Sequence, residues 1–319
     1  MTLRIAETES HDDAEPSYDF PNTSNRPSKA LKLHTQTHGD PYKMATEKSG
    51  SLTSVNADPY DPVDKNYYLG YRQNDFDKPF AKFYNSVTPP ISDELQKGLS
   101  ASPWASDLGY PAKEAKDYLL QKGYQLMENG YTILHDKTLF IAARTEIPEV
   151  TGDMYNWWFG WHLTDTTRYK LWNPIAHQYA WRHPNTLEWS TEDLPSRYIG
   201  SYSFISEFIG NDGGKLTIAF IDPAELGIDK RKFDDQGVEA MVVGHIHIGA
   251  HITSGFDDQS YLIHQVRRMS NGRRELRSRF WIAGASPQVG HDLMVHCGIE
   301  MSHLNTFLPT LYDEFKHSV

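Results

Sequence analysis

The sequence predicts an α+β protein in which a curved antiparallel sheet packs around one long C-terminal helix. Between residues 197 and 283, strand-like runs follow one another, and turns rich in Gly, Asn and Asp separate most of them. A run from about Pro287 to Lys316 then has helical length, with Pro309 as a possible break. Strands that precede a single long helix favour α+β architecture, with a cavity between the sheet and the helix.

The first 125 residues are expected to lie outside this sheet. Residues 1–60 are rich in Ser, Thr, Asp, Asn, Pro and Lys, so they bury too little apolar surface to offset the entropy of ordering. We interpret them as a disordered extension. Residues 61–125 mix short helical patterns with Pro-marked turns, and Pro111–Gly123 has apolar residues at helical spacing. We expect a small helical subdomain there that serves as a dimerisation contact.

The main body, residues 126–319, begins with a hairpin and a helix. Residues 132–134 and 138–142 read as two strands joined by a turn at 135–137. Thr151 is a good N-cap for a helix that continues through Trp161. The aromatic stretch that follows, to about Trp189, has no clear periodicity, so it is expected to be irregular. The later strands are expected at Arg197–Ile209, Leu216–Ile221, Ala240–Ile252, Ser260–Met269 and Arg277–Ala283.

The composition argues against nucleic-acid and membrane partners. The net charge is −11, whereas a phosphate backbone is bound by clustered Lys and Arg. The chain has no run of about eighteen apolar residues, and its first residues lack the apolar centre of a signal peptide. The single cysteine, Cys297, excludes an intrachain disulfide and fits a reducing compartment. A cytoplasmic protein is therefore expected.

Two compositional features each have two interpretations. Aromatic residues make up 13% of the chain, which suits either a protein that encloses a flat apolar ligand or a large aromatic core. One basic cluster surrounds a turn between two predicted strands, and we interpret it as a solvated hairpin end rather than a binding surface. It contains Arg267, Arg268, Arg273, Arg274, Arg277 and Arg279.

His296 and Glu300 carry the clearest chemical signal. They are four residues apart in the predicted C-terminal helix, so they lie on one face and can hold a single ion. The simpler interpretation is that His296 and Glu300 form a solvated pair. However, His303 shares this face of the helix, and apolar residues flank it. Ionisable groups on a buried stripe need a partner, because an unpaired buried charge is costly. A metal ion would be such a partner.

Two upstream residues could complete a four-ligand site. Glu207 lies in a strand-like run with apolar residues on both faces, which indicates a buried carboxylate, although an edge strand facing water remains the alternative. His177 lies in an aromatic segment and could equally be a core histidine bonded to the backbone. A set of imidazoles and carboxylates with an open position is typical of a catalytic zinc site.

A rival site does not rank far below the first on the residues alone. The run from Gly244 to His251 places His245, His247 and His251 on one face of a predicted strand. Histidines two apart on a strand are a recurrent metal pair, and a third could close the site. The alternative is one functional imidazole with the others partly exposed.

Standard motifs for other enzyme classes are absent from the sequence. It contains no P-loop, no dinucleotide glycine fingerprint after a strand, no His-Glu-x-x-His and no Gly-x-Ser-x-Gly. A serine-dependent hydrolase is therefore not expected.

Several longer patterns carry a family resemblance. They are the run 157–162, the run 168–174 with His177, the run 277–281, and the pair His296 and Glu300. With these, the chain from about Tyr67 to its C-terminus resembles the 2,4-diacetylphloroglucinol hydrolases, a family that also contains phloretin hydrolase. The resemblance covers about four fifths of the chain and omits the N-terminal extension.

The resemblance implies a helix-grip fold, like that of START domains and pollen allergens, and a zinc-dependent enzyme. The zinc would be held by His177, Glu207, His296 and Glu300, with His162 as the alternative to His177. Such an enzyme would cleave the carbon–carbon bond between a polyhydroxylated ring and its acyl group, and release a carboxylic acid. The substrate would be a small acylated polyphenol, and a homodimer is expected.

The resemblance also implies catalytic roles for three further residues. Tyr169 and Tyr261 are similar to the family's substrate-contacting tyrosines, and His245 or His247 to an additional active-site histidine. Two other functions remain open on the sequence. One is a non-enzymatic binder of apolar aromatic ligands in the helix-grip cavity, and the other is a metal-dependent lyase or cyclase.

Overall fold

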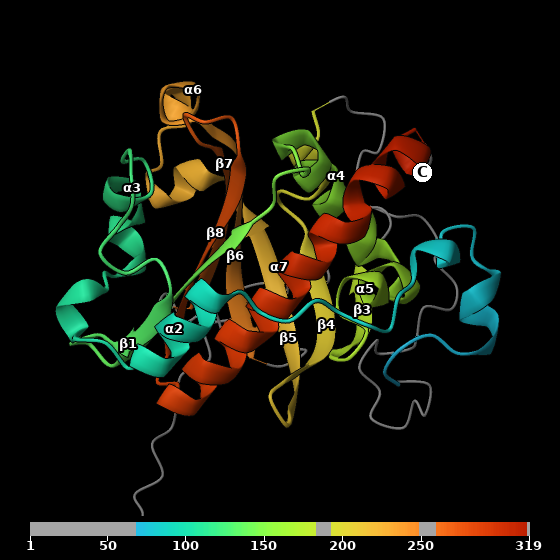
Figure 1. Cartoon of the computed structure of the whole chain (residues 1–319), viewed down its shortest axis with the longest axis horizontal. Helices are drawn as coiled ribbons and strands as arrows, with labels where there is room; N and C mark the ends of the chain where they lie inside the picture. Colours follow the sequence, from blue (N-terminus) through green and yellow to red (C-terminus); the bar gives the residue numbers. More distant parts are fainter. Residues whose placement is uncertain (1–67, 183–192, 249–259, 318–319) are drawn as a thin grey trace, which may run out of the picture. The chain divides into compact units, whose positions relative to one another are not determined.

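The computed structural model describes residues 68–182, 193–248 and 260–317, all within one compact unit of the chain. An eight-stranded antiparallel sheet, in the order β1-β2-β8-β7-β6-β5-β4-β3, forms its centre (Figure 1). The strands are β1 (Gly130–Ile133), β2 (Thr138–Glu146), β3 (His177–Arg182), β4 (Tyr202–Ile209), β5 (Asp212–Ile221), β6 (Val238–Ile248), β7 (Tyr261–Arg268) and β8 (Arg274–Ala283).

Two helices cover one face of the sheet, which we call the inner face. These are α7 (Pro287–Phe315), which crosses the strands diagonally in Figure 1, and α4 (Gly152–Trp161). Each begins at a capping residue whose side chain accepts a hydrogen bond from a backbone N–H group in the first turn. The cap of α4 is Thr151, as predicted, and that of α7 is Ser286. The alternation of strand side chains directs apolar residues such as Ile205 and Leu262 toward these helices. The predicted helix-grip architecture is confirmed by this arrangement of sheet and C-terminal helix.

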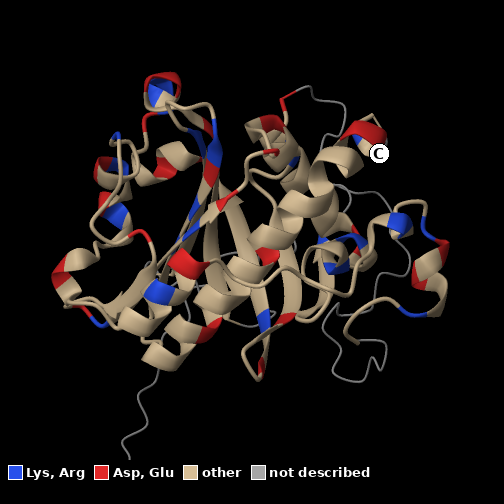
Figure 2. Ribbon diagram, in the orientation of Figure 1, with Lys and Arg blue, Asp and Glu red and all other residues tan. Residues whose placement is uncertain are grey.

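Helix α7 is buried for most of its length, which explains why it contains few charges. In Figure 2 it is drawn mostly in the colour of uncharged residues. Pro309 lies inside the helix and does not end it. The residues next to it on the inner side, Leu308 and Leu311, are fully buried, so packing against the sheet domain outweighs the lost backbone hydrogen bond.

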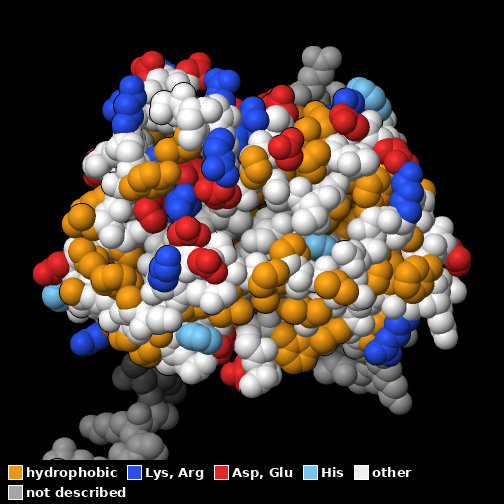
Figure 3. All heavy atoms as spheres, in the orientation of Figure 1, with side chains coloured by type: hydrophobic (Ala, Val, Ile, Leu, Met, Phe, Trp, Pro, Cys, Tyr) orange, Lys and Arg blue, Asp and Glu red, His pale blue; other side chains and the backbone are white. Residues whose placement is uncertain are grey.

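A segment that we call the strap, residues 68–101, crosses the side of α7 that faces away from the sheet (Figure 1). Its helix α2 (Asp93–Ala101) packs on α7 where Gly298 lacks a side chain. A Cβ atom at that position would lie 2.9 Å from side-chain atoms of both Ile91 and Leu95. Helix α7 is thus held closely between the strap and the sheet. On the side of the molecule where the strap lies, acidic, basic and hydrophobic side chains are intermixed on the surface (Figure 3).

The opposite face of the sheet, the outer face, has its own apolar cluster. Residues 110–127 cover it, with Tyr110 and Leu119 packed near Phe140 of β2 and Trp281 of β8. The indole N–H of Trp281 donates a hydrogen bond to the carbonyl oxygen of Tyr110 at 2.5 Å. The segment is therefore fixed to the sheet by both apolar packing and hydrogen bonds.

The basic cluster does not form a solvated hairpin end, and that interpretation was wrong for its inner members. Arg277 and Arg279 are fully buried, and both guanidinium groups pair with the Glu128 carboxylate at 2.5 Å. Arg267 is also buried and pairs with Glu275. These side chains leave β7 and β8 on the outer face, where the segment carrying Glu128 covers them. Only the members near the turn are exposed, as Arg273 is.

Most elements predicted after residue 60 are confirmed, but two predictions of local structure were wrong, and the strand predicted from Arg197 begins only at Tyr202. The predicted irregular stretch after Trp161 contains helix α5 (Thr166–Trp172) and strand β3, and the Pro111–Gly123 pattern forms only a short 3-10 turn and one helical turn. Residues 1–60 and the end of the predicted strand Ala240–Ile252 lie outside the described residues. The remaining short elements are η1 (Gln73–Asp77), η2 (Ala81–Phe83), η3 (Ser106–Leu108), η4 (Ala112–Glu114), α3 (Ala115–Tyr118), η5 (His162–Thr164), η7 (Pro195–Arg197), η8 (Pro223–Leu226), η9 (Lys230–Lys232) and α6 (Phe233–Gln236).

Within the described ranges, we find no helix with the length and apolar character that crossing a membrane requires. The dimerisation role expected for residues 61–125 remains a prediction.

Candidate metal centre

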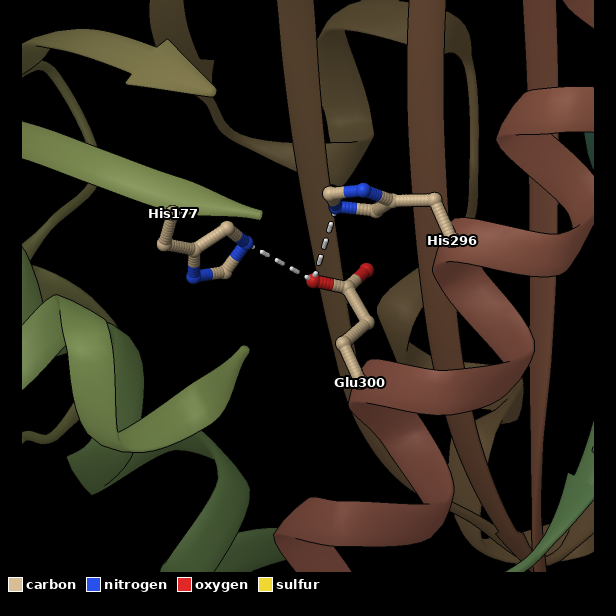
Figure 4. Close-up of side chains that lie close together, drawn as sticks. All are labelled: His177, His296 and Glu300. Atoms are coloured by element: carbon tan, nitrogen blue, oxygen red, sulfur yellow. Dashed lines mark ion pairs between the residues drawn. The ribbon is translucent and has the colours of Figure 1, made fainter. Parts of the chain in front are cut away.

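Three of the four predicted metal ligands meet at one point between the sheet and α7. His177 lies at the start of β3, while His296 and Glu300 extend from adjacent turns of α7 (Figure 4). Their candidate ligand atoms all lie within 4.8 Å of one another. The Glu300 Oε2 atom is 3.4 Å from His177 Nε2 and 3.5 Å from His296 Nε2. Among the described residues, this is the one such group of three or more His, Cys, Asp or Glu side chains.

Glu207 borders this group. Strands β3 and β4 pair so that His177 lies directly opposite Glu207, and both side chains are buried. The Glu207 Oε2 atom is 3.5 Å from His177 Nε2 and 3.7 Å from His296 Nε2. Glu207 therefore faces both histidines from the sheet, while Glu300 faces them from the helix.

Backbone carbonyl groups orient both histidines. His177 Nδ1 donates to the carbonyl oxygen of Tyr169 and His296 Nδ1 to that of Phe208, each at 3.0 Å. Because a carbonyl oxygen can only accept, Nδ1 carries a proton in both rings, and Nε2 is the nitrogen that faces the carboxylates. An imidazole whose distal N–H is bonded to a carbonyl is the usual form of a metal-binding histidine.

The donor set fits a divalent metal ion. The gaps of 3.4–3.7 Å between imidazole nitrogens and carboxylate oxygens are longer than tight charge-assisted hydrogen bonds. The buried His177 Nε2 atom also has no hydrogen-bond partner among the described residues. Two imidazole nitrogens and two carboxylates therefore face one another without pairing closely, and this N/O set suits zinc and its neighbours in the transition series.

Tyr169 supports two of these side chains at once. It lies in α5, and its hydroxyl donates a short hydrogen bond to the Glu207 Oε2 atom. Its ring stacks on the His177 imidazole, with a centroid separation of 3.7 Å and an angle of 4° between the planes. Tyr169 thus fixes the carboxylate by its hydroxyl and the imidazole by its ring and its backbone carbonyl.

The charges of the group stabilise one another. Burial alone would lower the pKa of His296, but the carboxylates of Glu207 and Glu300 outweigh it and raise that pKa to about 9. Burial would raise the pKa of Glu300, but His296 and His177 lower it to about 2. The site therefore holds negative carboxylates that favour a positive charge at its centre.

His162, the alternative first ligand, lies outside the group. It is fully buried, its Nδ1 donates to the carbonyl oxygen of Trp158 at 2.6 Å, and its ring stacks on the Trp158 indole. Burial holds the pKa of His162 well below its usual value, so the imidazole is neutral. The structure therefore brings His177 rather than His162 to His296 and Glu300.

His245 and Tyr261 come together elsewhere. They form a cross-strand pair of β6 and β7, and their rings stack with centroids 4.4 Å apart. Their strand positions direct them to the outer face, since the neighbouring Ile246 and Leu262 belong to the inner-face core. His247 is next to His245 on that face, at 5.3 Å between centroids. His251, the third member of the rival site, lies outside the described residues, and the catalytic roles of His245 and Tyr261 remain predictions.

The sequence analysis missed one buried histidine, His264. It extends from β7 on the inner face, and its Nδ1 atom lies 2.8 Å from the Ser278 Oγ atom of β8. The signal was available, because His264 lies two residues from Leu262 and two from Val266 in an apolar alternation. It was not distinguished from the many other histidines of the chain.

The chain matches a known family over most of the sheet domain. A family model described as the DAPG hydrolase PhiG domain matches residues 111–291, which is more than half of the 319 residues. The chain belongs to this family. The family predicted from the sequence is thus confirmed, and with it the predicted enzyme class.

Relatives of the DAPG hydrolase family include two bacterial enzymes. The chain is 27% identical to the 2,4-diacetylphloroglucinol hydrolase of Pseudomonas protegens over 268 residues, which cover 75% of this chain and 85% of the relative. It is also 27% identical to the phloretin hydrolase of Eubacterium ramulus over 258 residues, which cover 74% and 90%. Both alignments therefore span most of each enzyme.

Solved structures resemble the chain only distantly. A START superfamily protein from Mycobacterium smegmatis is 14% identical, with a TM-score of 0.31, and covers 55% of this chain and 97% of its own. A ginseng major latex-like protein is 16% identical, with a TM-score of 0.32, and covers 52% and 98%. The fold assignment of this DAPG hydrolase family member therefore rests on its own sheet and helices.

Proposed function

We propose that this protein is a metal-dependent hydrolase of acylated polyphenols, with zinc as the metal. It would cleave the carbon–carbon bond between a polyhydroxylated ring and its acyl carbon. The observation that carries the proposal is the convergence of His177, His296 and Glu300 at one buried point. The relatives named for hydrolysis of 2,4-diacetylphloroglucinol and of phloretin support this substrate class.

The residues that would hold the ion are His177, His296 and Glu300, with Glu207 as the fourth ligand. When bound, a divalent ion supplies Lewis-acid chemistry, which polarises a carbonyl group and lowers the pKa of water. The protein supplies the orientation of this donor set through the carbonyl groups of Tyr169 and Phe208. It also excludes bulk water, because every one of these side chains is more than nine-tenths buried.

The reaction consumes one water molecule. The bond from the ring carbon to the acyl carbon breaks, the acyl carbon gains the water oxygen, and the ring carbon gains a proton. A polyhydroxylated ring can take a keto form, so its carbon can accept that proton before it leaves. Tyr169 is the proposed proton carrier, because its hydroxyl already holds a proton against the Glu207 carboxylate.

Further features of the proposal follow the family resemblance. We propose that the active species is a homodimer in a reducing, cytoplasmic environment. The single cysteine, Cys297, supports the reducing environment, since it is buried and cannot form an intrachain disulfide. Sedimentation of the purified full chain measures the oligomeric state directly.

Metal analysis combined with product analysis tests the function. The purified full chain is expected to contain about one zinc per chain, and to release a carboxylic acid from 2,4-diacetylphloroglucinol or phloretin in a chelator-sensitive reaction. Replacing Glu300 with Gln is expected to lower zinc content and activity together. A fully active, zinc-replete Glu300→Gln variant would refute its role as a ligand. Neither metal nor turnover in the wild type would favour a non-enzymatic aromatic binder.

A further inference from the structure

Helix α5 carries a side chain that supports the metal centre, although the helix itself is short. Its seven residues make about two turns, and isolated helices of that length are at best marginally stable in water. Tyr169 of this helix bonds to Glu207 by its hydroxyl and stacks on His177 by its ring. The position of α5 therefore affects two proposed ligands, so the contacts that fix α5 also bear on the metal centre.

The strap bonds to the beginning of α5 at two points. The Tyr71 hydroxyl donates a short, buried hydrogen bond to the carbonyl oxygen of Thr167 in the first turn. Lys78 Nζ lies 3.0 Å from Oδ2 of Asp165, the N-cap residue of α5. The other oxygen of this carboxylate, Oδ1, accepts from the backbone N–H of Thr167 at 2.8 Å. The strap thus holds both the cap and the first turn.

The strap also holds the middle of α5 through Lys170, the residue after Tyr169. Lys170 is only 2% exposed. Its ammonium group donates to the carbonyl oxygen of Gly70 at 3.1 Å and lies 3.8 Å from the ring centroid of Tyr68. Burying an ammonium group is costly unless such partners replace the water that it loses. Because both partners belong to the strap, removing the strap would leave this charge without them.

The approach at Gly70 is close enough to exclude a side chain. Its φ of +69° lies in the left-handed region that favours glycine, and a Cβ atom there would lie 2.8 Å from the Tyr84 hydroxyl oxygen. The same Cβ would lie 3.9 Å from the carbonyl oxygen of Pro174, in the turn that leads from α5 to His177. In Figure 1 the beginning of the strap, drawn in blue, lies beside α5.

We infer that the strap positions the metal centre through α5, with Tyr71 as the main positioning residue. The contacts lead from the Tyr71 hydroxyl to the backbone of α5, and from Tyr169 in that helix to the Glu207 carboxylate and the His177 imidazole. Loss of a strap contact lets α5 shift and misaligns both proposed ligands together, although no strap residue needs to touch the ion. The inference rests on the metal site of the proposed function.

The zinc affinity of Tyr71→Phe tests this inference. The variant loses only the hydroxyl, since its ring can remain stacked on that of Tyr84, with centroids 4.1 Å apart in the wild type. Competition with a chromogenic chelator measures the Kd of the full chain for zinc. We expect the Kd to rise about 3-fold or more, which is less than the 10–100-fold typical of groups that bond to a ligand directly. Wild-type affinity in Tyr71→Phe overturns the inference.

Two matched controls on the strap separate this role from general loosening. Tyr84→Phe removes a hydroxyl from the same stack, but no hydrogen bond joins that hydroxyl to α5 among the described residues. Lys82→Met breaks an ion pair with Glu314, near the end of α7, whereas Lys78→Met breaks the one with the cap of α5. Both controls are expected to keep wild-type affinity, and Lys78→Met to weaken it. Equal losses in Tyr71→Phe and Tyr84→Phe overturn the inference.

A double-mutant cycle tests the route through Tyr169. Tyr169→Phe already loses the hydrogen bond to Glu207, so a shift of α5 has less left to disturb. The rise in Kd caused by Tyr71→Phe is therefore expected to be smaller in the Tyr169→Phe background than in the wild type. Independent effects that simply multiply would contradict the inference, because the strap would then act without Tyr169.

Cobalt(II) in place of zinc provides a readout that a loss of stability alone does not change. Its visible absorption bands depend on the geometry of the ligands. At saturating cobalt, the bands of Tyr71→Phe are expected to be shifted, and those of Tyr84→Phe to match the wild type. Weaker affinity with wild-type bands in Tyr71→Phe would show a loss of stability alone and overturn the inference. Thermal unfolding of the metal-free variants checks that each is folded.

The wild type distinguishes failure of this inference from failure of the proposed function. If it binds zinc and cleaves an acylphenol, but Tyr71→Phe keeps wild-type affinity and bands, the role of the strap alone is refuted. If it binds zinc but cleaves no acylphenol, the proposed function fails, and the affinities and bands still decide the inference. A wild type that binds no divalent ion refutes both.

Discussion

At the scale of single residues, Tyr169 has more than one contact with the candidate metal centre. Its hydroxyl bonds to Glu207, its ring stacks on His177, and its carbonyl oxygen accepts from His177 Nδ1. The sequence resemblance implies a substrate contact for this tyrosine. The structure adds a second role, since the positions of two proposed ligands depend on one side chain.

Replacing Tyr169 with Phe separates these contacts. The variant keeps the ring and the backbone carbonyl but loses the hydrogen bond to Glu207. We expect metal affinity to fall about 10-fold, because groups that orient metal ligands typically contribute 10–100-fold to affinity. Competition with a chromogenic chelator measures this, and thermal unfolding of the metal-free protein is the control. Unaltered affinity would show that Glu207 needs no help from the hydroxyl.

His264 leads to a second prediction, which concerns how the free energy of unfolding depends on pH. Its pKa is about 4 in the folded chain and 6.5 in the unfolded chain, so the unfolded state takes up a proton first as pH falls. The stabilisation is complete above pH 6.5 and is lost between 6.5 and 4. From pH 7 to pH 5, wild type should lose about 2 kcal/mol of unfolding free energy relative to His264→Phe. Urea unfolding of both proteins measures the difference, and parallel pH curves would contradict it.

The predictability of the site varies among its residues. The spacing of His296 and Glu300 on a helix is visible in the sequence. The pairing of His177 with Glu207 is not, because it depends on the register of β3 against β4, and only the family resemblance suggested it. The face to which His245 points could not be assigned either, since strand alternation gives two faces without saying which one meets α7.

At the scale of secondary-structure elements, the sequence predicted the long strands and both long helices, where periodicity and caps are clear. It missed α5 and β3, because these short elements lie in a run of aromatic residues that has no single period. The sequence analysis also placed the buried Arg267, Arg277 and Arg279 in a solvated hairpin end. Charge alone indicates exposure, and Glu128, the partner of Arg277 and Arg279, is about 150 residues away in the chain.

Glu128 is therefore expected to hold the segment of residues 110–128 against strand β8. Replacing it with Gln removes the charge that both Arg277 and Arg279 face in a buried site. We expect a loss of about 3–5 kcal/mol in the free energy of unfolding, as for other broken buried ion pairs. Denaturant unfolding of the metal-free protein measures this.

A surface ion pair provides the control for Glu128. Glu146 also pairs with an arginine, Arg273, but both side chains are more than half exposed. Glu146→Gln is expected to change the unfolding free energy by less than about 1 kcal/mol, because exposed pairs contribute little. Similar losses in the two variants would show that the buried network does not hold residues 110–128 against the sheet.

At the scale of the whole molecule, the candidate metal centre brings together parts of the chain that are otherwise separate. His177 and Glu207 come from one edge of the sheet, and His296 and Glu300 from the helix that crosses it. An ion bound by all of them would link the sheet edge to α7. Such an ion binds the folded chain and not the unfolded one, so it should stabilise the fold by mass action.

Removal of metal is therefore expected to lower stability. At a free zinc concentration about 100 times the Kd, the unfolding free energy should exceed that of the chelated protein by about 2.7 kcal/mol. Calorimetric unfolding with and without chelator measures this, and added zinc should restore the higher midpoint. The same experiment on Glu300→Gln should show a smaller gain, whereas equal gains would place the ion at another site.

The position of α7 after all eight strands has a consequence for biosynthesis. The ribosome releases the N-terminal end first, so β1 to β8 emerge while the helix that covers their inner face is still being translated. Until then, that apolar face has no helix across it, and half of the metal centre does not yet exist. A nascent chain of this protein should thus depend on chaperones until α7 has emerged from the ribosome, and binding of a metal ion by all four residues must follow that step.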